Sequence, residues 1–193
     1  VRRWIDPDAP GACPYGTGPD ELFVAYNASA EVRCHFALGW PVPARIIDLG
    51  AEFKNLTSGL SLPHGRGQLG ALMFFGLNHV DPARKSEMQK LAGEGGLLTA
   101  EQCAAILDYC GTDVDGLCLL WSAMQAKLDV PRALIRGRYM AALAAVERNG
   151  IPVDTPMLDE IRQAWPMIRP RLISTVDENY NVFDGEHFVM ARF

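Results

Sequence analysis

The chain has 193 residues, of which 49% are hydrophobic and 21% charged, and its formal net charge is -5. This length suits one domain, or one domain with an appendage. No apolar run approaches the roughly 20 residues of a membrane span, and the acidic balance argues against coating nucleic acid through phosphate neutralisation alone.

The first residue and the cysteines bear on the origin of the chain. It begins at Val1 rather than at methionine, which indicates either processing or a piece of something longer. The five cysteines are odd in number and lack CxxC spacing, so we expect reduced thiols in an intracellular protein. Cys103, Cys110 and Cys118 recur at steps of seven and eight residues, which favours burial on one helix face.

The first third of the chain is expected to contain two strands. Residues 1–20 are rich in proline, glycine and aspartate and read as a loop. The apolar run 21–26 predicts a buried strand, and a short helix is expected over 29–38. Residues 44–49 predict a second strand, with a helix following toward Leu56.

Helices are expected to fill the rest of the chain. Their predicted ranges are 68–77, 99–126, 131–148 and 154–175. Thr99 and Gln102 form a capping box at the start of the second range, and Asp154 with Pro156 marks the start of the last. The stretch 81–90 is polar and leads to a helix breaker at 93–96, and the tail 180–193 shows no clear element.

Two strands cannot cover their own edges, because an isolated pair is only marginally stable. Either residues 1–5 supply a strand, or the missing strands precede Val1. An open edge also makes a dimer through that edge a candidate assembly. The predicted fold class is therefore α/β and predominantly helical, with a small remnant sheet.

Four side chains are candidates for chemistry. Tyr109 and Asp113 are four residues apart on a predicted helix, where a phenol beside a carboxylate can orient a metal-held water. The alternative is a core tyrosine and a solvated acid. Glu31 either faces the end of the sheet or is a favourable helix N-terminal acid. Asp48 closes the second strand, a usual ligand position, or caps the next helix.

Taken together, these residues resemble the DnaQ-like (DEDD) 3'-5' exonucleases, in particular the proofreading domain of phage-type family A DNA polymerases. Tyr109 and Asp113 resemble the third motif of that family, a tyrosine, three residues and an aspartate. The stretch 24–31 resembles the second motif, and Asp48 stands where the family often has an aspartate. Residues 140–161 resemble the junction at which these polymerases leave the exonuclease domain.

The departures from the family pattern concern the second and first motifs. Tyr26, Ala30 and Glu31 stand where histidine, phenylalanine and aspartate are common, and the first motif, Asp-x-Glu on a strand, does not appear. The resemblance implies a partial ribonuclease H-like exonuclease domain over 1–130, lacking its first-motif strands. It implies the helical start of a polymerase domain over 131–193. We expect an acidic strand motif before Val1 and a polymerase domain after Phe193.

The resemblance also implies a reaction and a location. The family hydrolyses the 3'-terminal phosphodiester of DNA with two Mg²⁺ or Mn²⁺ ions. Glu31 and Asp113 would be direct metal ligands, Tyr109 would orient the attacking water, and Asn27 and Asp48 would support them. The expected partners are single-stranded or primer-template DNA and the rest of the polymerase chain, with no membrane, in the cytoplasm of a bacterial or phage-infected cell.

Metal binding and activity are expected to be weak or absent in this chain alone, because the first-motif acids normally bridge both ions. A weak positive patch for DNA is predicted on one helix, at Arg132, Arg136 and Arg138. One alternative is a non-catalytic exonuclease-like scaffold or DNA-binding module. Another is an unrelated helical interaction protein, in which Tyr109 and Asp113 would lie far from Glu31.

Overall fold

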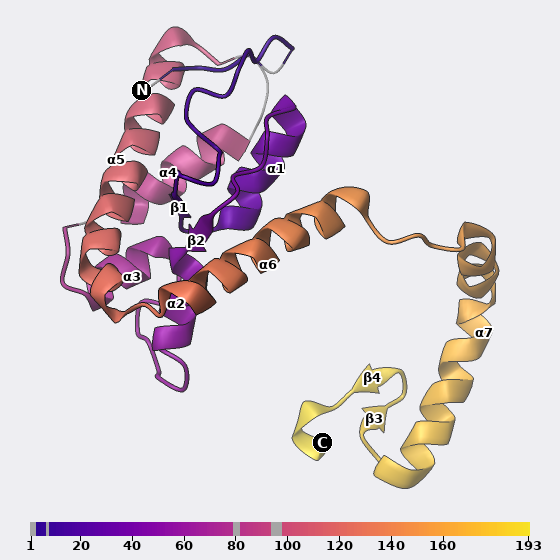
Figure 1. Ribbon diagram of the computed structural model, residues 1–193. Coiled ribbons are helices and arrows are strands. Elements are labelled where there is room, and N and C mark those ends of the chain that lie inside the picture. Colours follow the sequence, from indigo (N-terminus) through magenta and orange to yellow (C-terminus); the bar gives the residue numbers. More distant parts are fainter. Residues whose placement is uncertain (1–2, 7, 79–81, 94–97) are drawn as a thin grey trace. The chain divides into compact units, whose positions relative to one another are not determined.

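The computed structural model describes residues 3–6, 8–78, 82–93 and 98–193 (Figure 1). The chain divides into two compact units, Val1–Asn149 and Gly150–Phe193. The described residues are mostly helical and include a small parallel pair of strands, so the predominantly helical α/β class is confirmed.

The first unit is organised around a βαβ arrangement. Strand β1 (Phe23–Ala25) pairs in parallel with β2 (Ile46–Asp48), and the register aligns Phe23 with Ile46 and Ala25 with Asp48. Helix α1 (Ala28–Leu38) makes the crossover that a parallel pair requires. Residues 3–5 form no strand, and residues 1 and 2 lie outside the described residues. Within the described ranges, β1 and β2 pair only with each other.

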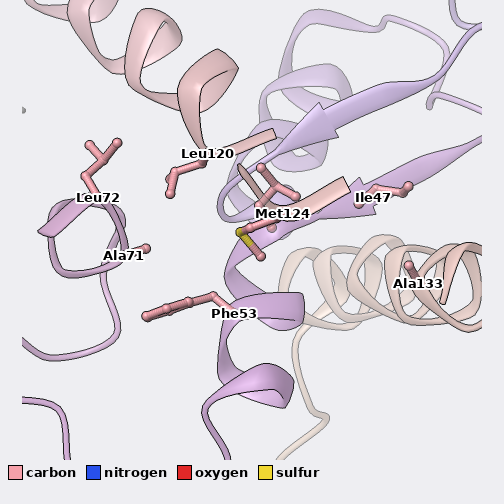
Figure 2. Close-up of a cluster of buried hydrophobic side chains, with 8 residues drawn as sticks. Ile47, Phe53, Ala71, Leu72, Leu120, Met124 and Ala133 are labelled. Atoms are coloured by element: carbon pink, nitrogen blue, oxygen red, sulfur yellow. The ribbon is translucent and has the colours of Figure 1, made fainter. Parts of the chain in front are cut away.

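Helices cover both faces of this small sheet. Because neighbouring strand residues point to opposite sides, Ile46 and Ile47 enter two different clusters. Ile46 packs with Val32 of α1 and Ala144 of α6 (Val130–Asn149) in one cluster. Ile47 belongs to the other cluster, which also contains Leu49, Phe53, Ala71, Leu72, Leu120, Met124 and Ala133 (Figure 2). These residues come from α2 (Leu49–Leu56), α3 (Gln68–Phe74), α5 (Ala100–Met124) and α6.

Helix α6 approaches β2 very closely at Gly137. A β-carbon built on Gly137 would lie 2.0 Å from the carbonyl oxygen of Ile46. The missing side chain therefore lets the helix backbone lie directly against the strand. Gly150, with φ of 69°, follows the last residue of α6, and a left-handed glycine at this position ends a helix as the sequence predicted.

The middle of the chain adds one helix and corrects one expectation. The polar stretch 81–90, to which no element is assigned from sequence, contains most of α4 (Pro82–Gly93), while residue 81 lies outside the described residues. Cys110 and Cys118 are exposed and Cys103 is only half-buried, so their predicted core packing is wrong. The buried face of α5 is formed instead by Ile106, Tyr109, Gly111, Gly116, Leu120 and Met124. The capping box at Thr99 and Gln102 is confirmed.

The second unit consists of one long helix and a short hairpin. Helix α7 (Thr155–Tyr180) begins at Asp154, whose side chain accepts a hydrogen bond from the Met157 amide at 3.0 Å. It carries Pro166 and Pro170 in its interior and runs beyond the predicted end at 175.

The tail, in which the sequence showed no clear element, forms a hairpin. Strands β3 (Phe183–Asp184) and β4 (His187–Phe188) pair antiparallel, and the short helix η2 (Met190–Arg192) follows. An ion pair between Arg169 and Glu186 ties the hairpin to α7. Every helix in the described ranges is too short or too polar to cross a bilayer.

Candidate functional site

A cleft of about 920 Å³ lies at the carboxyl ends of β1 and β2. Its walls come from the segments after both strands, from the loop before α3, and from α4, α5 and α6. The predicted site residues that line it are Asn27, Glu31, Asp48, Asp113 and Arg136. Tyr109, Arg132 and Arg138 are not among its lining residues.

Asp48 has a structural role at the base of the cleft. Its side chain is 1% exposed, and each carboxylate oxygen holds the start of a different helix. Oδ1 accepts a hydrogen bond from the Ala51 amide of α2, and Oδ2 accepts one from the Ala28 amide of α1, both at 2.9 Å. The amides at the start of a helix have no partner within that helix. One aspartate therefore satisfies such an amide in two helices and holds both helices to the end of β2.

Glu31 differs from Asp48 in having an unused oxygen. Its Oε2 atom is buried and has no hydrogen-bond partner among the described residues. Burial raises the pKa of this carboxyl group, and the nearby charge of Asp48 raises it further. A partly desolvated carboxylate with a free oxygen in a cleft is suited to binding a cation or a proton donor.

Asn27 lies at the junction of β1 and α1. Its Oδ1 accepts a hydrogen bond from the Ser29 hydroxyl at 3.2 Å, and its side chain makes no cap on α1. Asn27 lines the cleft together with Glu31, which lies four residues later in the chain. Both residues belong to the stretch 24–31 that resembles the second motif.

Tyr109 and Asp113 lie one turn apart on α5. The Tyr109 ring is 8% exposed, and its buried hydroxyl makes no hydrogen bond of normal geometry with the described residues. Burial raises the Tyr109 pKa, and the adjacent Asp113 carboxylate raises it further, so the hydroxyl stays protonated beside that acid. The Asp113 carbonyl also accepts a hydrogen bond from Gln68 Nε2 at 2.7 Å, which links α5 to the start of α3.

The three predicted arginines have different surroundings. Arg136 donates two hydrogen bonds to Glu52, from Nε to Oε1 at 2.6 Å and from Nη2 to Oε2 at 2.7 Å. This pairing raises the Arg136 pKa. Arg132 pairs with Asp129 at the surface, and Arg138 is exposed. Of the three, Arg136 lines the cleft, and the Glu52 carboxylate matches its charge.

Sequence reasoning assigned no role to several residues in or beside this cleft. Glu52, which pairs with Arg136 but does not itself line the cleft, is 1% exposed, and its signal in the sequence was an acid inside an otherwise largely apolar short helix. Tyr26 donates a hydrogen bond from its hydroxyl to the Arg66 carbonyl at 2.9 Å, and burial raises its pKa. Lys54, Arg66 and Tyr139 also line the cleft, and no motif drew attention to them.

The donor set partly suits the metal ions that the family resemblance implies. Glu31 and Asp113 both line the cleft, and carboxylate oxygens are the ligands that Mg²⁺ and Mn²⁺ prefer. The described part of the chain contains no group of three or more His, Cys, Asp or Glu residues placed to hold an ion. Besides the structural Asp48, these two acids are the carboxylates that line the cleft among the described residues.

Comparison with protein-family models, with curated proteins and with solved structures found no match to this chain.

Proposed function

We propose that the first unit is the 3'-5' exonuclease-like domain of a phage-type family A DNA polymerase. Its substrate would be the 3'-terminal phosphodiester of single-stranded or primer-template DNA, in the cytoplasm of a bacterial or phage-infected cell. The observation that carries the proposal is the shared cleft. Glu31 of the second-motif stretch and Asp113 of the third-motif stretch are far apart in sequence, and both line it.

Two acids and a tyrosine would carry the chemistry. Glu31 offers its free Oε2 and Asp113 its carboxylate to a divalent cation. Magnesium or manganese, when bound, lowers the pKa of a coordinated water toward neutrality. The protonated Tyr109 hydroxyl beside Asp113 would orient that acid and its water. Asp48 fixes the helix that carries Glu31 relative to β2.

The ribonuclease H-like fold belongs to the same proposal. The parallel β1–β2 pair with helices on both faces supports it, as does the position of the cleft at the carboxyl ends of the strands. With two acids in place of a full ligand set, we expect weak hydrolysis by this chain alone. First-motif acids supplied by preceding sequence would raise it.

Hydrolysis of labelled DNA tests the proposal. The chain is incubated with 5'-labelled single-stranded DNA and Mn²⁺, and shortening from the 3' end is followed on a gel. We expect slow trimming that falls at least about 100-fold in Glu31→Gln and in Asp113→Asn, because each removes a metal ligand. The matched control is Asp159→Asn, an exposed acid of the second unit, which should trim like the parent chain. Trimming that survives both cleft substitutions would refute the proposal.

The second candidate function is a non-catalytic exonuclease-like module that binds DNA. The number of possible metal ligands favours this function. Beyond the structural Asp48, the described residues supply two acids to the cleft, which is fewer than a two-metal site needs. It predicts DNA binding without trimming, whether or not Mn²⁺ is present. Manganese titration by calorimetry separates the two functions, because heat of binding that disappears in Asp113→Asn supports the hydrolytic site.

A further inference from the structure

The cleft that holds Glu31 and Asp113 has a second wall, which neither motif accounts for. Helix α2 contributes Lys54 to this wall, and α6 contributes Tyr139 and Met140. We call Lys54 and Tyr139, with the helix surfaces that carry them, the α2–α6 wall. It combines a cation with an exposed aromatic ring beside the candidate catalytic acids.

Lys54 is a cation for which the described residues supply no counter-charge. It is exposed, and its ammonium group makes no ion pair or hydrogen bond with the described residues, whereas the charge of Arg136 is matched by Glu52. Gly50 and Ala51 line the cleft one turn earlier on α2, so Lys54 continues the same helix face. A lysine with these properties can bind an anionic group that enters the cleft.

Tyr139 is a large ring on a firmly held backbone. It is 65% exposed although it lines the cleft. Arg136, one turn earlier on α6, is fixed to α2 by its two bonds to Glu52, and Gly137 lies directly against β2. The ring therefore projects from a rigid part of the helix, and a planar ligand that stacks on it need not order the backbone first.

An aromatic ring and an unpaired cation in one groove are the two elements with which proteins bind single-stranded nucleic acid, since bases stack on rings and phosphates pair with cations. The cleft volume of about 920 Å³ is at the upper end of ligand pockets and has room for a nucleotide. A duplex does not offer an internal base face for stacking, whereas an unpaired end does.

We propose that the α2–α6 wall binds the unpaired end of a DNA strand, with Tyr139 stacking on a base and Lys54 holding a phosphate. This inference rests on the proposed exonuclease function, because it places the strand end beside Glu31 and Asp113. It assigns substrate binding to residues outside both motifs, and it requires no metal ion.

Binding without hydrolysis tests this inference separately. The full chain is titrated against a fluorescent oligothymidine of about 10 nucleotides in the presence of EDTA, and anisotropy gives Kd. We expect Tyr139→Ala to raise Kd about 5- to 100-fold through loss of stacking, and Tyr139→Phe to stay within about twofold because the ring remains. Tyr180→Ala, at a 69% exposed tyrosine of the second unit, is the matched control and should bind like the parent chain.

Salt dependence isolates the role of Lys54. Each phosphate contact in a single strand contributes about 0.7 to the slope of log binding constant against log salt. Lys54→Ala should therefore reduce this slope by about 0.7, and Lys54→Arg should keep it. An unchanged slope in Lys54→Ala would overturn the contact between Lys54 and a phosphate. Equal loss of binding in Tyr139→Phe and Tyr139→Ala would overturn the stacking of the Tyr139 ring on a base.

The outcomes separate this inference from the hydrolytic function. Metal-dependent trimming together with unchanged binding by Tyr139→Ala would refute DNA binding by the α2–α6 wall and leave the hydrolytic function standing. Binding that depends on the ring, without any trimming, overturns the hydrolytic activity alone. No binding by the parent chain up to about 100 µM, the upper end of non-specific affinities, also overturns the wall.

Discussion

Replacing Gly137 by alanine tests how closely α6 lies on the sheet. The added β-carbon would lie 2.0 Å from the Ile46 carbonyl oxygen and 2.6 Å from its carbon, both of them backbone atoms of β2. Ordinary contact begins at 3.4 Å, so the helix and strand must separate by roughly 1.4 Å, the difference between 3.4 and 2.0. No side-chain rotation can relieve this contact, because neither partner atom belongs to a side chain.

Two opposing effects set the size of the change. Overpacking of this kind costs about 1–3 kcal/mol. Since a gap of about 1 Å also forfeits up to half of the local dispersion attraction, we expect a cost near the upper end of that range, about 3 kcal/mol. Alanine in place of glycine stabilises a helix by about 1 kcal/mol. The expected net loss of unfolding free energy is about 2 kcal/mol.

Urea unfolding followed by far-ultraviolet circular dichroism measures this loss. With a slope of about 2 kcal/mol per molar urea, the midpoint should fall by about 1 M. Gly116→Ala on α5 is the matched control, because its β-carbon would meet the ends of the flexible Leu72 and Gln68 side chains at 3.2 and 3.3 Å. We expect the control to change stability by less than about 1 kcal/mol. A midpoint that rises in Gly137→Ala would show that helix propensity outweighs the contact and would refute the reasoning.

Two further predictions concern charges in and beside the cleft. Arg136→Ala leaves the buried Glu52 carboxylate without its partner and should cost about 3–5 kcal/mol in the same urea titration. Arg136→Lys should recover less than half of that, because one ammonium cannot make the two-pronged contact, and full recovery would contradict this. Glu31 has a raised pKa in the folded state, so its stabilising contribution is present below its unfolded pKa and is lost as pH rises through the folded pKa. Glu31→Gln should therefore unfold at higher urea than the parent chain at pH 7 and at nearly equal urea below about pH 4.3, and an equal gain at both pH values would contradict this cause.

Local signals in the sequence predicted the elements whose ends are set by a few neighbouring residues. The capping box of Thr99 and Gln102, the Asp154 cap and the left-handed Gly150 each act within one helical turn, and each is present in the structure. Helix α4 was missed for the same reason. Its residues are largely polar and show no apolar period, so nothing local distinguishes it from a polar loop.

Contacts between distant segments were beyond sequence reasoning. The Glu52 and Arg136 pair joins helices separated by most of the first unit, and neither residue lies in a recognisable pattern with the other. The candidate acids could be picked out because each lies at a strand end or at a fixed spacing on one helix. That Glu31 and Asp113 share a cleft depends on where α1 and α5 lie in the folded first unit, which periodicity does not encode.

The boundary between the two compact units lies after Asn149. The start of a polymerase part at residue 131 is implied by the family resemblance and stays a prediction. Helix α6 is the element in question. Its Ala133 and Ala144 are both buried in the clusters of the first unit, and Arg136 lines the cleft. In physical terms α6 therefore belongs with the candidate site.

The two prolines inside α7 change the mechanics of that helix. Neither residue has an amide hydrogen, so the carbonyl groups of Arg162 and Pro166, four positions earlier, receive no helical hydrogen bond. The two missing bonds fall one turn apart on the same side of the helix. Helix α7 therefore lacks two hydrogen bonds on one side of its middle, and this is where the helix bends at the least cost in backbone hydrogen bonding.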